Sequence, residues 1–277
     1  MSVTIALAGN PNCGKTTMFN ALTGANQYVG NWPGVTVEKK EGKLKNQKDV
    51  TVTDLPGIYS LSPYTLEEVV SRDYLLKEKP DVIIDLVDAT NIERNLYLAT
   101  QLLEIGIPVV IALNMVDLLK KNNIHINVKG LSSALGCPIV ETSALKGTGL
   151  KEVVDEAIKC ANQHRVPSKQ MEFPKAVEKA VNEIEGFVPA NIAEENKRWY
   201  AVKLLERDSK VKEGLNLPAS AQSKIEEIAS NLEKAEDDDT ESIVTDGRYQ
   251  YIQKVVSANV KRSGNKMTVS DKIDRIV

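Results

Sequence analysis

The sequence predicts an α/β domain with a mostly parallel sheet over residues 1–165, followed by an all-α helical domain over residues 166–277. Up to residue 165, short β-branched runs alternate with longer helical patterns, as in βαβ units. Aromatic residues make up only 5% of the chain, which is typical of the aliphatic cores of parallel sheets and helix bundles. After Arg165 the β-branched runs stop and apolar residues recur at helical spacing, so we place the domain boundary there.

The individual elements of the first domain follow from the same patterns, taken in chain order. The expected strands lie at 3–8, 37–44, 49–54, 81–88, 108–114 and 138–141. The expected helices lie at 16–23, 66–77, 91–104, 128–135 and 149–161. The 37–44 segment is charged throughout, and charged side chains are typical of exposed edges, so we expect an edge strand there.

The second domain is predicted from apolar faces at helical spacing, and about five helices can bury such faces against one another. The residues of these faces are Ala176, Val177, Ala180, Val181, Ile184, Trp199, Val202, Leu205, Ile225, Ile228, Ala229, Leu232, Ile252, Val255, Val256 and Val260. The acidic run 236–239 is interpreted as a solvated loop between helices in preference to a metal site. The last residues, 269–277, predict a helix without a cap.

Composition excludes several classes of function. The formal net charge is −3, with 35 basic and 38 acidic residues, so no global field attracts nucleic acid or anionic lipid. No apolar run approaches the roughly 18 residues of a membrane span, and the first residues lack the basic region of a signal peptide. Cys13, Cys137 and Cys160 are odd in number and scattered, which favours reduced thiols over a disulfide framework.

A phosphate-binding loop is predicted at residues 9–16, which fit the pattern G-x-x-x-x-G-K-[ST] between an apolar strand and a helix. The glycines let successive backbone N–H groups surround a phosphate chain, with the helix N-terminus behind them. Lys15 supplies charge to the outer phosphates, and the Thr16 hydroxyl is placed to ligate Mg2+. The residues assigned to phosphate binding are Asn10, Asn12, Cys13, Gly14, Lys15, Thr16 and Thr17.

Selection of the base is assigned to Asn114, Met115 and Asp117, at the carboxyl end of the 108–114 strand. The Asp117 carboxylate can accept hydrogen bonds from both N1–H and the exocyclic amine of guanine, whereas adenine has no such donor pair. Ser143, Ala144 and Leu145 follow the next strand, where their backbone could contact the base. Earlier in the chain, Asp54 is placed for the Mg2+ shell and Gly57 lets the backbone approach the γ-phosphate.

These motifs, in this order, resemble the translation-factor-like branch of small GTPases. Residues 9–12 and 29–38, which read GNPN and VGNWPGVTVE, are similar to the cytosolic GTPase domain of ferrous iron transport protein B, FeoB. The resemblance covers about the first 165 residues. It implies GTP hydrolysis to GDP and phosphate, regulation of Fe2+ uptake, and a location on the cytoplasmic side of a bacterial membrane. It also implies a transmembrane transport domain outside this chain and a helical domain that slows GDP release.

Carried over residue by residue, the resemblance assigns catalytic roles to Lys15, Thr36 and Gly57 and an Mg2+ site to Thr16, Thr36 and Asp54. It assigns an activating K+ to Asn12, with carbonyl groups at Gly30 and Trp32. Asn12 as a simple turn residue is the alternative to its K+ role. Two departures are expected to matter. Ile58 occupies the position of the water-orienting glutamine, which predicts slow, K+-stimulated turnover, and Met115 replaces a lysine that packs on the base.

Three weaker features have two interpretations each. Trp32 is either an exposed anchor for a partner or a docked, buried loop residue. Cys13 is either a redox sensor or, as we favour, a small filler of the phosphate loop. Cys160 and His164 could supply two metal ligands, but His125 is the only other histidine, so a plain helix surface is favoured.

Two rival functions share the same nucleotide-binding core. A ribosome- or RNA-associated GTPase would need a basic appendage, which the helical half lacks. A non-catalytic, GTP-dependent interaction module would explain Ile58 as a sign of lost hydrolysis. The expected partners are therefore GTP or GDP and the transport domain, not nucleic acid, and a homo-oligomer stays open.

Overall fold

The computed structural model describes residues 2–25, 27–45 and 47–263 and contains a seven-stranded sheet in the order β2-β3-β4-β1-β5-β6-β8. Strands β4, β1, β5, β6 and β8 are parallel, whereas β2 and β3 extend the sheet as an antiparallel ribbon. The strand bounds are β1 Val3–Gly9, β2 Gln27–Asn31, β3 Glu38–Leu44, β4 Gln47–Asp54, β5 Val82–Asp88, β6 Val109–Asn114 and β8 Ile139–Glu141. The predicted mostly parallel sheet is confirmed.

The edge assignment of residues 37–44 is wrong. Residues 38–44 form β3, which lies between β2 and β4, and the edge strand is β2, for which no strand was expected. Both Tyr28 and Val29 are exposed, so successive side chains on both faces of β2 point away from the core. A strand with no buried face has no alternation of apolar and polar residues, which is the reason that the pattern missed it.

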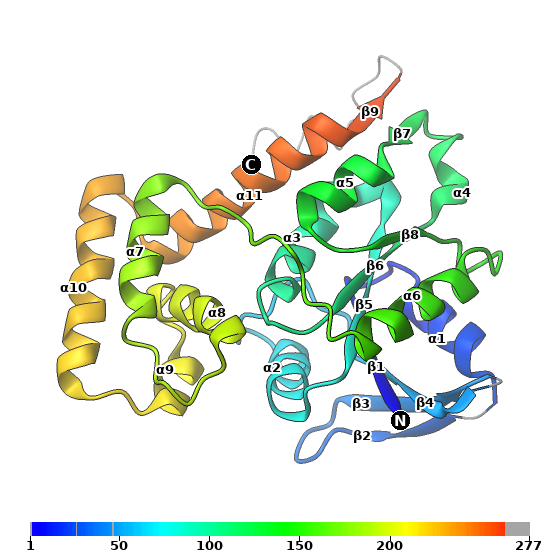
Figure 1. Cartoon of the computed structure of the whole chain (residues 1–277), viewed down its shortest axis with the longest axis horizontal. Coiled ribbons are helices and arrows are strands. Elements are labelled where there is room, and N and C mark those ends of the chain that lie inside the picture. Colours follow the sequence, from blue (N-terminus) through cyan, green and yellow to red (C-terminus); the bar gives the residue numbers. More distant parts are fainter. Residues whose placement is uncertain (1, 26, 46, 264–277) are drawn as a thin grey trace.

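Helices cover the two faces of the sheet in separate groups (Figure 1). Helices α1 (Lys15–Thr23) and α6 (Leu150–Asn162) pack on one face, where Ile5, Leu7 and Ile84 lie. Helices α2 (Leu66–Asp73), α3 (Ile92–Leu102) and α5 (Val128–Leu135) pack on the other, where Ile83 lies. Adjacent residues Ile83 and Ile84 are both fully buried on opposite faces, as expected of a strand covered on both sides.

The helix expected at 66–77 is divided into two parts. It begins with a capping box, because the Thr65 side chain accepts from the N–H of Glu68 and the Glu68 carboxylate accepts from the N–H of Thr65. The α-helix ends at Asp73, and a wider helical turn, η1, continues over Tyr74–Glu78. This turn buries Tyr74 and Leu75 against the sheet. Three short elements were also not expected: α4 (Val116–Leu119), β7 (Ile124–Ile126) and β9 (Val260–Arg262).

The second half of the described chain is a helical domain, as predicted. Its helices are α7 (Lys175–Glu185), α8 (Glu194–Leu205), α9 (Ser209–Leu215), α10 (Ala219–Glu236) and α11 (Thr240–Asn259). Helix α11 leaves this group, runs along α3 and α5, and leads into β9, which pairs with β7 (Figure 1). The buried apolar residues of α7, α8 and α11 join those of α3 and α5 in one cluster, so the helical domain shares its core with one face of the sheet.

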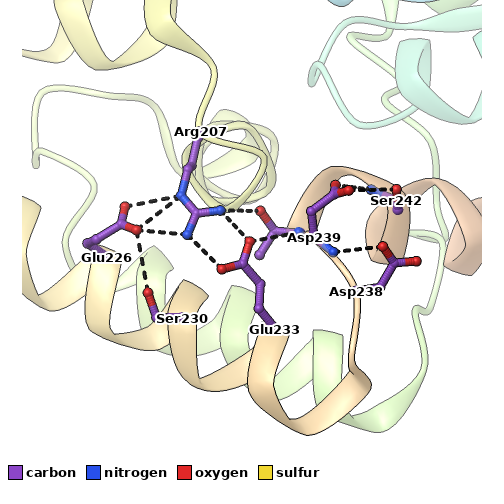
Figure 2. A network of polar contacts seen from close by, with 8 residues as sticks. Arg207, Glu226, Ser230, Glu233, Asp238, Asp239 and Ser242 are labelled. Carbon is purple, nitrogen blue, oxygen red and sulfur yellow. Dashed lines mark hydrogen bonds and ion pairs between the residues drawn. The ribbon is translucent and has the colours of Figure 1, made fainter.

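Arg207 fixes the corner between α8 and α9 onto α10. Its guanidinium donates to Glu226 at 2.7 Å, to both carboxylate oxygens of Glu233, and to the Thr240 hydroxyl (Figure 2). The acidic run 236–239 ends α10 and turns into α11, and Asp239 caps α11 by accepting from the N–H of Ser242. The predicted loop between helices is therefore confirmed.

The helix predicted at 269–277 lies outside the described residues.

Two buried ion pairs join the helical domain to the sheet domain. Arg72 of α2 donates to Asp208 at 2.7 Å, and both side chains are 3% exposed. Arg248 of α11 donates to Glu104 at 2.7 Å, and both are almost completely buried. Asp208 also caps α9 through the N–H of Val211. A charge left without its partner at either place would be strongly destabilising.

We predict that Asp208→Asn lowers the free energy of unfolding by about 3 kcal/mol, because Asn preserves the cap of α9 but removes the charge that faces Arg72. Chemical denaturation followed by circular dichroism measures this change. The matched control is Asp155→Asn, which removes an exposed partner of Lys151 at 3.9 Å and should stay within about 0.5 kcal/mol of the parent. Equal stability of the two variants would contradict the role given to the Arg72–Asp208 pair.

Candidate functional site

A cavity lies at the carboxyl ends of the parallel strands, where α/β sheets bind ligands. Its volume is about 720 Å³. The register aligns these ends: Asp54 of β4 lies beside Leu7 of β1, and Asn114 of β6 lies beside Asp88 of β5. The residues that line the cavity are Asn10, Pro11, Asn12, Gly14, Lys15, Thr16, Thr17, Gly57, Asn114, Met115, Asp117, Leu118, Ser143, Ala144 and Leu145.

The phosphate-binding loop owes its shape to left-handed backbone conformations. Asn12 has φ +67° and Gly14 has φ +96°, and Gly14 is the cap residue from which α1 begins. A β-carbon at Gly14 would collide with the side-chain amide of Asn114, so glycine is required there both for conformation and for space. The loop thus leads directly into the first turn of α1, the arrangement in which backbone N–H groups form an anion-binding nest.

Lys15, which lines the cavity, forms an ion pair with Asp54, which lies beneath it at the end of β4. The Lys15 ammonium lies 2.6 Å from Oδ1 of Asp54, and both side chains are largely buried. Burial raises the pKa of Asp54, and the nearby Lys15 charge opposes that rise. The Asp54 carboxylate therefore already faces a cation at the end of β4, and with the Thr16 hydroxyl it offers the oxygen donors that Mg2+ prefers. Asp54 does not itself line the cavity, and its place in a magnesium site with Thr16 stays a prediction.

The opposite end of the cavity is built around the side chain of Asn114, which is 2% exposed. Its amide nitrogen donates to the carbonyl oxygen of Cys13 at 2.8 Å. Its amide oxygen accepts from the N–H of Ala144 at 2.9 Å and from the Thr142 hydroxyl at 3.2 Å. Asn114 thus ties the phosphate-binding loop to the 143–145 segment and fixes the distance between the two ends of the cavity.

Asp117 lies in α4, one residue after Val116, at the same end as Asn114. Its carboxylate lies 3.3 Å from the Lys146 ammonium. The Ser143 hydroxyl, and secondarily Lys146, lower the pKa of Asp117, so the carboxylate is ionised throughout the neutral range. Leu118 and Leu145 are both exposed on the cavity wall, where they offer apolar surface to a planar ring.

Several predicted site residues do not line this cavity. The Cys13 side chain is 1% exposed and lies in the core beneath the loop, so only its backbone belongs to the site. Thr36 is exposed in a bend before β3. Gly30 lies in β2, paired with Lys39. Trp32 is buried at 7% exposure. The roles given to Thr36, Gly30 and Trp32 in metal binding stay predictions.

Of the two interpretations of Trp32, the structure shows the docked, buried loop residue. Its ring meets Tyr74 edge to face at a centroid distance of 5.3 Å, and the Lys39 ammonium lies 5.1 Å from the ring centroid. The indole N–H has no hydrogen-bond partner among the described residues. Tyr74 belongs to the wide turn after α2, so the segment before β3 and the segment after Gly57 contact each other through this pair.

Ile58 has no polar role. Its side chain is 3% exposed within the core, and its N–H donates to the Gly9 carbonyl at 3.3 Å, beside the phosphate-binding loop. The sequence reasoning missed Pro11 and Leu118, which line the cavity, and Lys146, which contacts Asp117. Lys146 follows the 143–145 segment directly, and that position was the available signal.

The cysteine and histidine considered as metal ligands, Cys160 and His164, do not form a common site. Cys160 is buried in α6, whereas His164 lies exposed beyond the end of that helix with φ +47°. No group of three or more His, Cys, Asp or Glu side chains suited to a metal ion occurs among the residues that the structure describes. Within the same residues, no helix combines the length and the apolar character that crossing a membrane requires.

The parallel sheet, the phosphate-binding loop after β1 and the Asn114–Asp117 motif after β6 define a P-loop GTPase fold. Comparison with known families matches residues 3–157 to ferrous iron transport protein B and residues 173–261 to the FeoB cytosolic helical domain. The chain belongs to the FeoB family.

Individual relatives agree with this assignment. The Fe(2+) transporter FeoB of Shigella flexneri is 39% identical over 99% of this chain, which spans 36% of that relative's length. A mutant of S. thermophilus NFeoB bound to GDP is 47% identical, covers 94% of this chain and is itself covered completely, with a TM-score of 0.90. S. thermophilus NFeoB bound to GDP, AlF4− and K+ is 48% identical over 92% of this chain and 99% of its own, with a TM-score of 0.84.

We predict that none of the three thiols reacts with a water-soluble disulfide reagent in the folded protein at pH 8. Cys13, Cys137 and Cys160 are all buried, and burial, with a smaller contribution from Asp85, raises the pKa of Cys13 to about 12. All three should react once the chain is unfolded in guanidinium chloride. Rapid native reaction of Cys13 that nucleotide prevents would instead support the redox-sensor interpretation.

Proposed function

We propose that this chain binds and hydrolyses GTP as the cytosolic switch part of a ferrous iron transporter. The observation that carries the proposal is the position of Asp117 at one end of a cavity whose other end is the phosphate-binding loop. The chain spans about a third of its curated relatives, 36% of the first of them, so iron transport is assigned to a region outside this chain. In this proposal, the chain lies on the cytoplasmic side of a bacterial membrane.

Guanine selection follows from hydrogen-bond geometry. The Asp117 carboxylate accepts from N1–H and the exocyclic amine of guanine, and adenine presents an acceptor at N1 in place of that donor. The Ala144 N–H is held by Asn114 at the same end, which fixes the 143–145 backbone near the base. Met115, with φ +64°, lines the cavity beside them and contributes an apolar contact.

At the phosphate end, the backbone N–H groups from Asn12 to Thr17 bind the phosphate oxygens, and Lys15 neutralises their charge. Thr16 and Asp54 would hold Mg2+, which supplies further charge neutralisation at the outer phosphates. Thr36 would join them when the segment before β3 closes on the γ-phosphate, as an order-to-disorder switch requires. Gly57 lines the cavity without a side chain, so its backbone can approach the same phosphate.

Without a glutamine at position 58, other groups must position the attacking water and stabilise the charge that develops on the phosphates. Ile58 is buried, so backbone groups and cations must do this work. Asn12 lines the cavity and is our candidate K+ ligand, with the carbonyl groups of Gly30 and Trp32. The K+ and GDP·AlF4− complex of S. thermophilus NFeoB supports the same cation in this chain.

Coupling to the helical domain is proposed to run through α2. That helix follows the loop of Gly57, and its Arg72 reaches Asp208 at the corner between α8 and α9. A change in the loop would thereby act on the helical domain, which we propose slows GDP release. The net charge of −3 does not favour the RNA-associated alternative.

We predict that phosphate release from GTP is faster in KCl than in NaCl by roughly tenfold or more, because a cation beside the phosphates stabilises the developing charge. ATP serves as the control nucleotide. Asn12→Ala should bind GDP but lose the difference between the salts. Equal rates of the parent protein in both salts would contradict the K+ site. GTP that is bound but not hydrolysed in either salt would favour the non-catalytic interaction module.

We predict that Asp117→Asn weakens GDP binding by about ten- to hundredfold, because the amide cannot accept both guanine hydrogen bonds. Lys15→Ala should abolish binding of guanine and other nucleotides alike. Titration calorimetry with GDP and with xanthosine diphosphate, whose C2 carbonyl can accept from the new amide, separates the two effects. Retained preference for GDP in Asp117→Asn would show that another residue selects the base.

A further inference from the structure

The loop after β8 holds Lys146 at a fixed place on the rim of the cavity. Ser143 and Thr148 exchange two backbone hydrogen bonds across the loop, and the N–H of Lys146 donates to the Ser143 carbonyl at 3.1 Å. Gly149 follows with φ +74°, and a β-carbon there would collide with the Glu141 carbonyl oxygen. The backbone of this turn is therefore closely specified, and the Lys146 side chain is its adjustable part.

That side chain reaches Asp117, the residue assigned to base selection. The distance between the Lys146 ammonium and Oδ2 of Asp117 is 3.3 Å. The Asp117 side chain is 17% exposed, whereas the Lys146 side chain is 59% exposed. The ammonium thus approaches from the solvent side onto a recessed carboxylate. Among the residues that the structure describes, Lys146 is the only cationic side chain in ion-pair contact with Asp117.

We propose that Lys146 sets the affinity for guanine nucleotides by competing with the base for the Asp117 carboxylate. The inference rests on the proposed function, because it requires Asp117 to bind guanine. Guanine donates its N1–H and its amine to the two carboxylate oxygens, and the ammonium already lies 3.3 Å from one of them, Oδ2. The base and the ammonium therefore draw on the same oxygen, and the loosening of the Lys146 contact on binding lowers affinity.

The same pair accelerates release. When guanine leaves, a recessed carboxylate would be left without a compensating positive charge, which is unfavourable. Lys146 is positioned to take the carboxylate over as the base departs, because its backbone does not need to move. Lys146 is thus an intrinsic exchange element at the base end of the cavity, distinct from Lys15, which acts on the phosphates at the other end.

Two other roles for Lys146 predict the opposite result. A lysine that merely attracts the anionic nucleotide, or that packs its stem on the base, would strengthen binding. Replacement of Lys146 would then weaken GDP binding, whereas replacement of a competitor strengthens it. The sign of the change therefore separates competition from attraction.

The test measures GDP affinity and release by stopped-flow fluorescence with an N-methylanthraniloyl derivative of GDP. Lys146→Ala should bind about two- to fivefold more tightly, with most of the gain in slower release, as expected from breaking one exposed ion pair. The matched control is Lys151→Ala, which removes a more exposed lysine, 87% against 59%, from a pair with Asp155 on α6 and should leave both values unchanged. Lys146→Arg keeps the competing charge and should not bind more tightly than the parent. Weaker or unchanged binding by Lys146→Ala would overturn the proposal.

A double-mutant cycle with Asp117→Asn completes the test. In that background the lysine has no carboxylate to occupy, so adding Lys146→Ala should give no gain in GDP affinity. An equal gain in both backgrounds would overturn the proposal in favour of a general electrostatic effect. Asp117→Asn alone reports on the proposed function: if it leaves GDP binding intact, base selection by Asp117 fails, whatever Lys146→Ala does.

Discussion

The side-chain amide of Asn114 is the constraint on which the nucleotide site depends. It is buried at the end of β6, and it connects three backbone segments that are distant in the sequence: the loop before α1, the strand end itself, and the turn after β8. An amide satisfies this arrangement because it donates on one side and accepts on the other. An aspartate there could not donate to the Cys13 carbonyl, and an apolar residue would leave both loops without their partner.

The two faces of the sheet support different parts of the molecule. The face covered by α1 and α6 has a core of its own, which supports the phosphate-binding loop from below through Cys13 and Met18. The face covered by α2, α3 and α5 shares its core with the helical domain. Parts of the molecule that must keep one shape thus lie on the first face, and the helix that follows Gly57 lies on the second. Such a division lets the helical domain act on the switch segment without disturbing the phosphate-binding loop.

Local patterns predicted most of this structure. Six strands, the phosphate-binding loop and the Asp117 motif were predicted because each is encoded in a short run of residues. Burial of Trp32 was not decided, because it depends on Tyr74, which reaches the indole only through a wide helical turn that no periodicity reveals. The pairing of β7 with β9 was missed for a similar reason: each strand has three residues, and their partners lie more than a hundred residues apart. The domain boundary at residue 165 stays a prediction.

The β7–β9 pair also determines how a mechanical load would enter the molecule. Its antiparallel register is extended by hydrogen bonds from the Asn127 N–H to the Asn259 carbonyl and from the Ser263 N–H to the Asn123 carbonyl. Hydrogen bonds in such a pair lie across the strand direction, so tension along β9 is shared among them at once. Tension along β9 is therefore shared between α11, its covalent continuation, and the segment that follows Asp117 and α4. Part of that load reaches the guanine end of the site through β7.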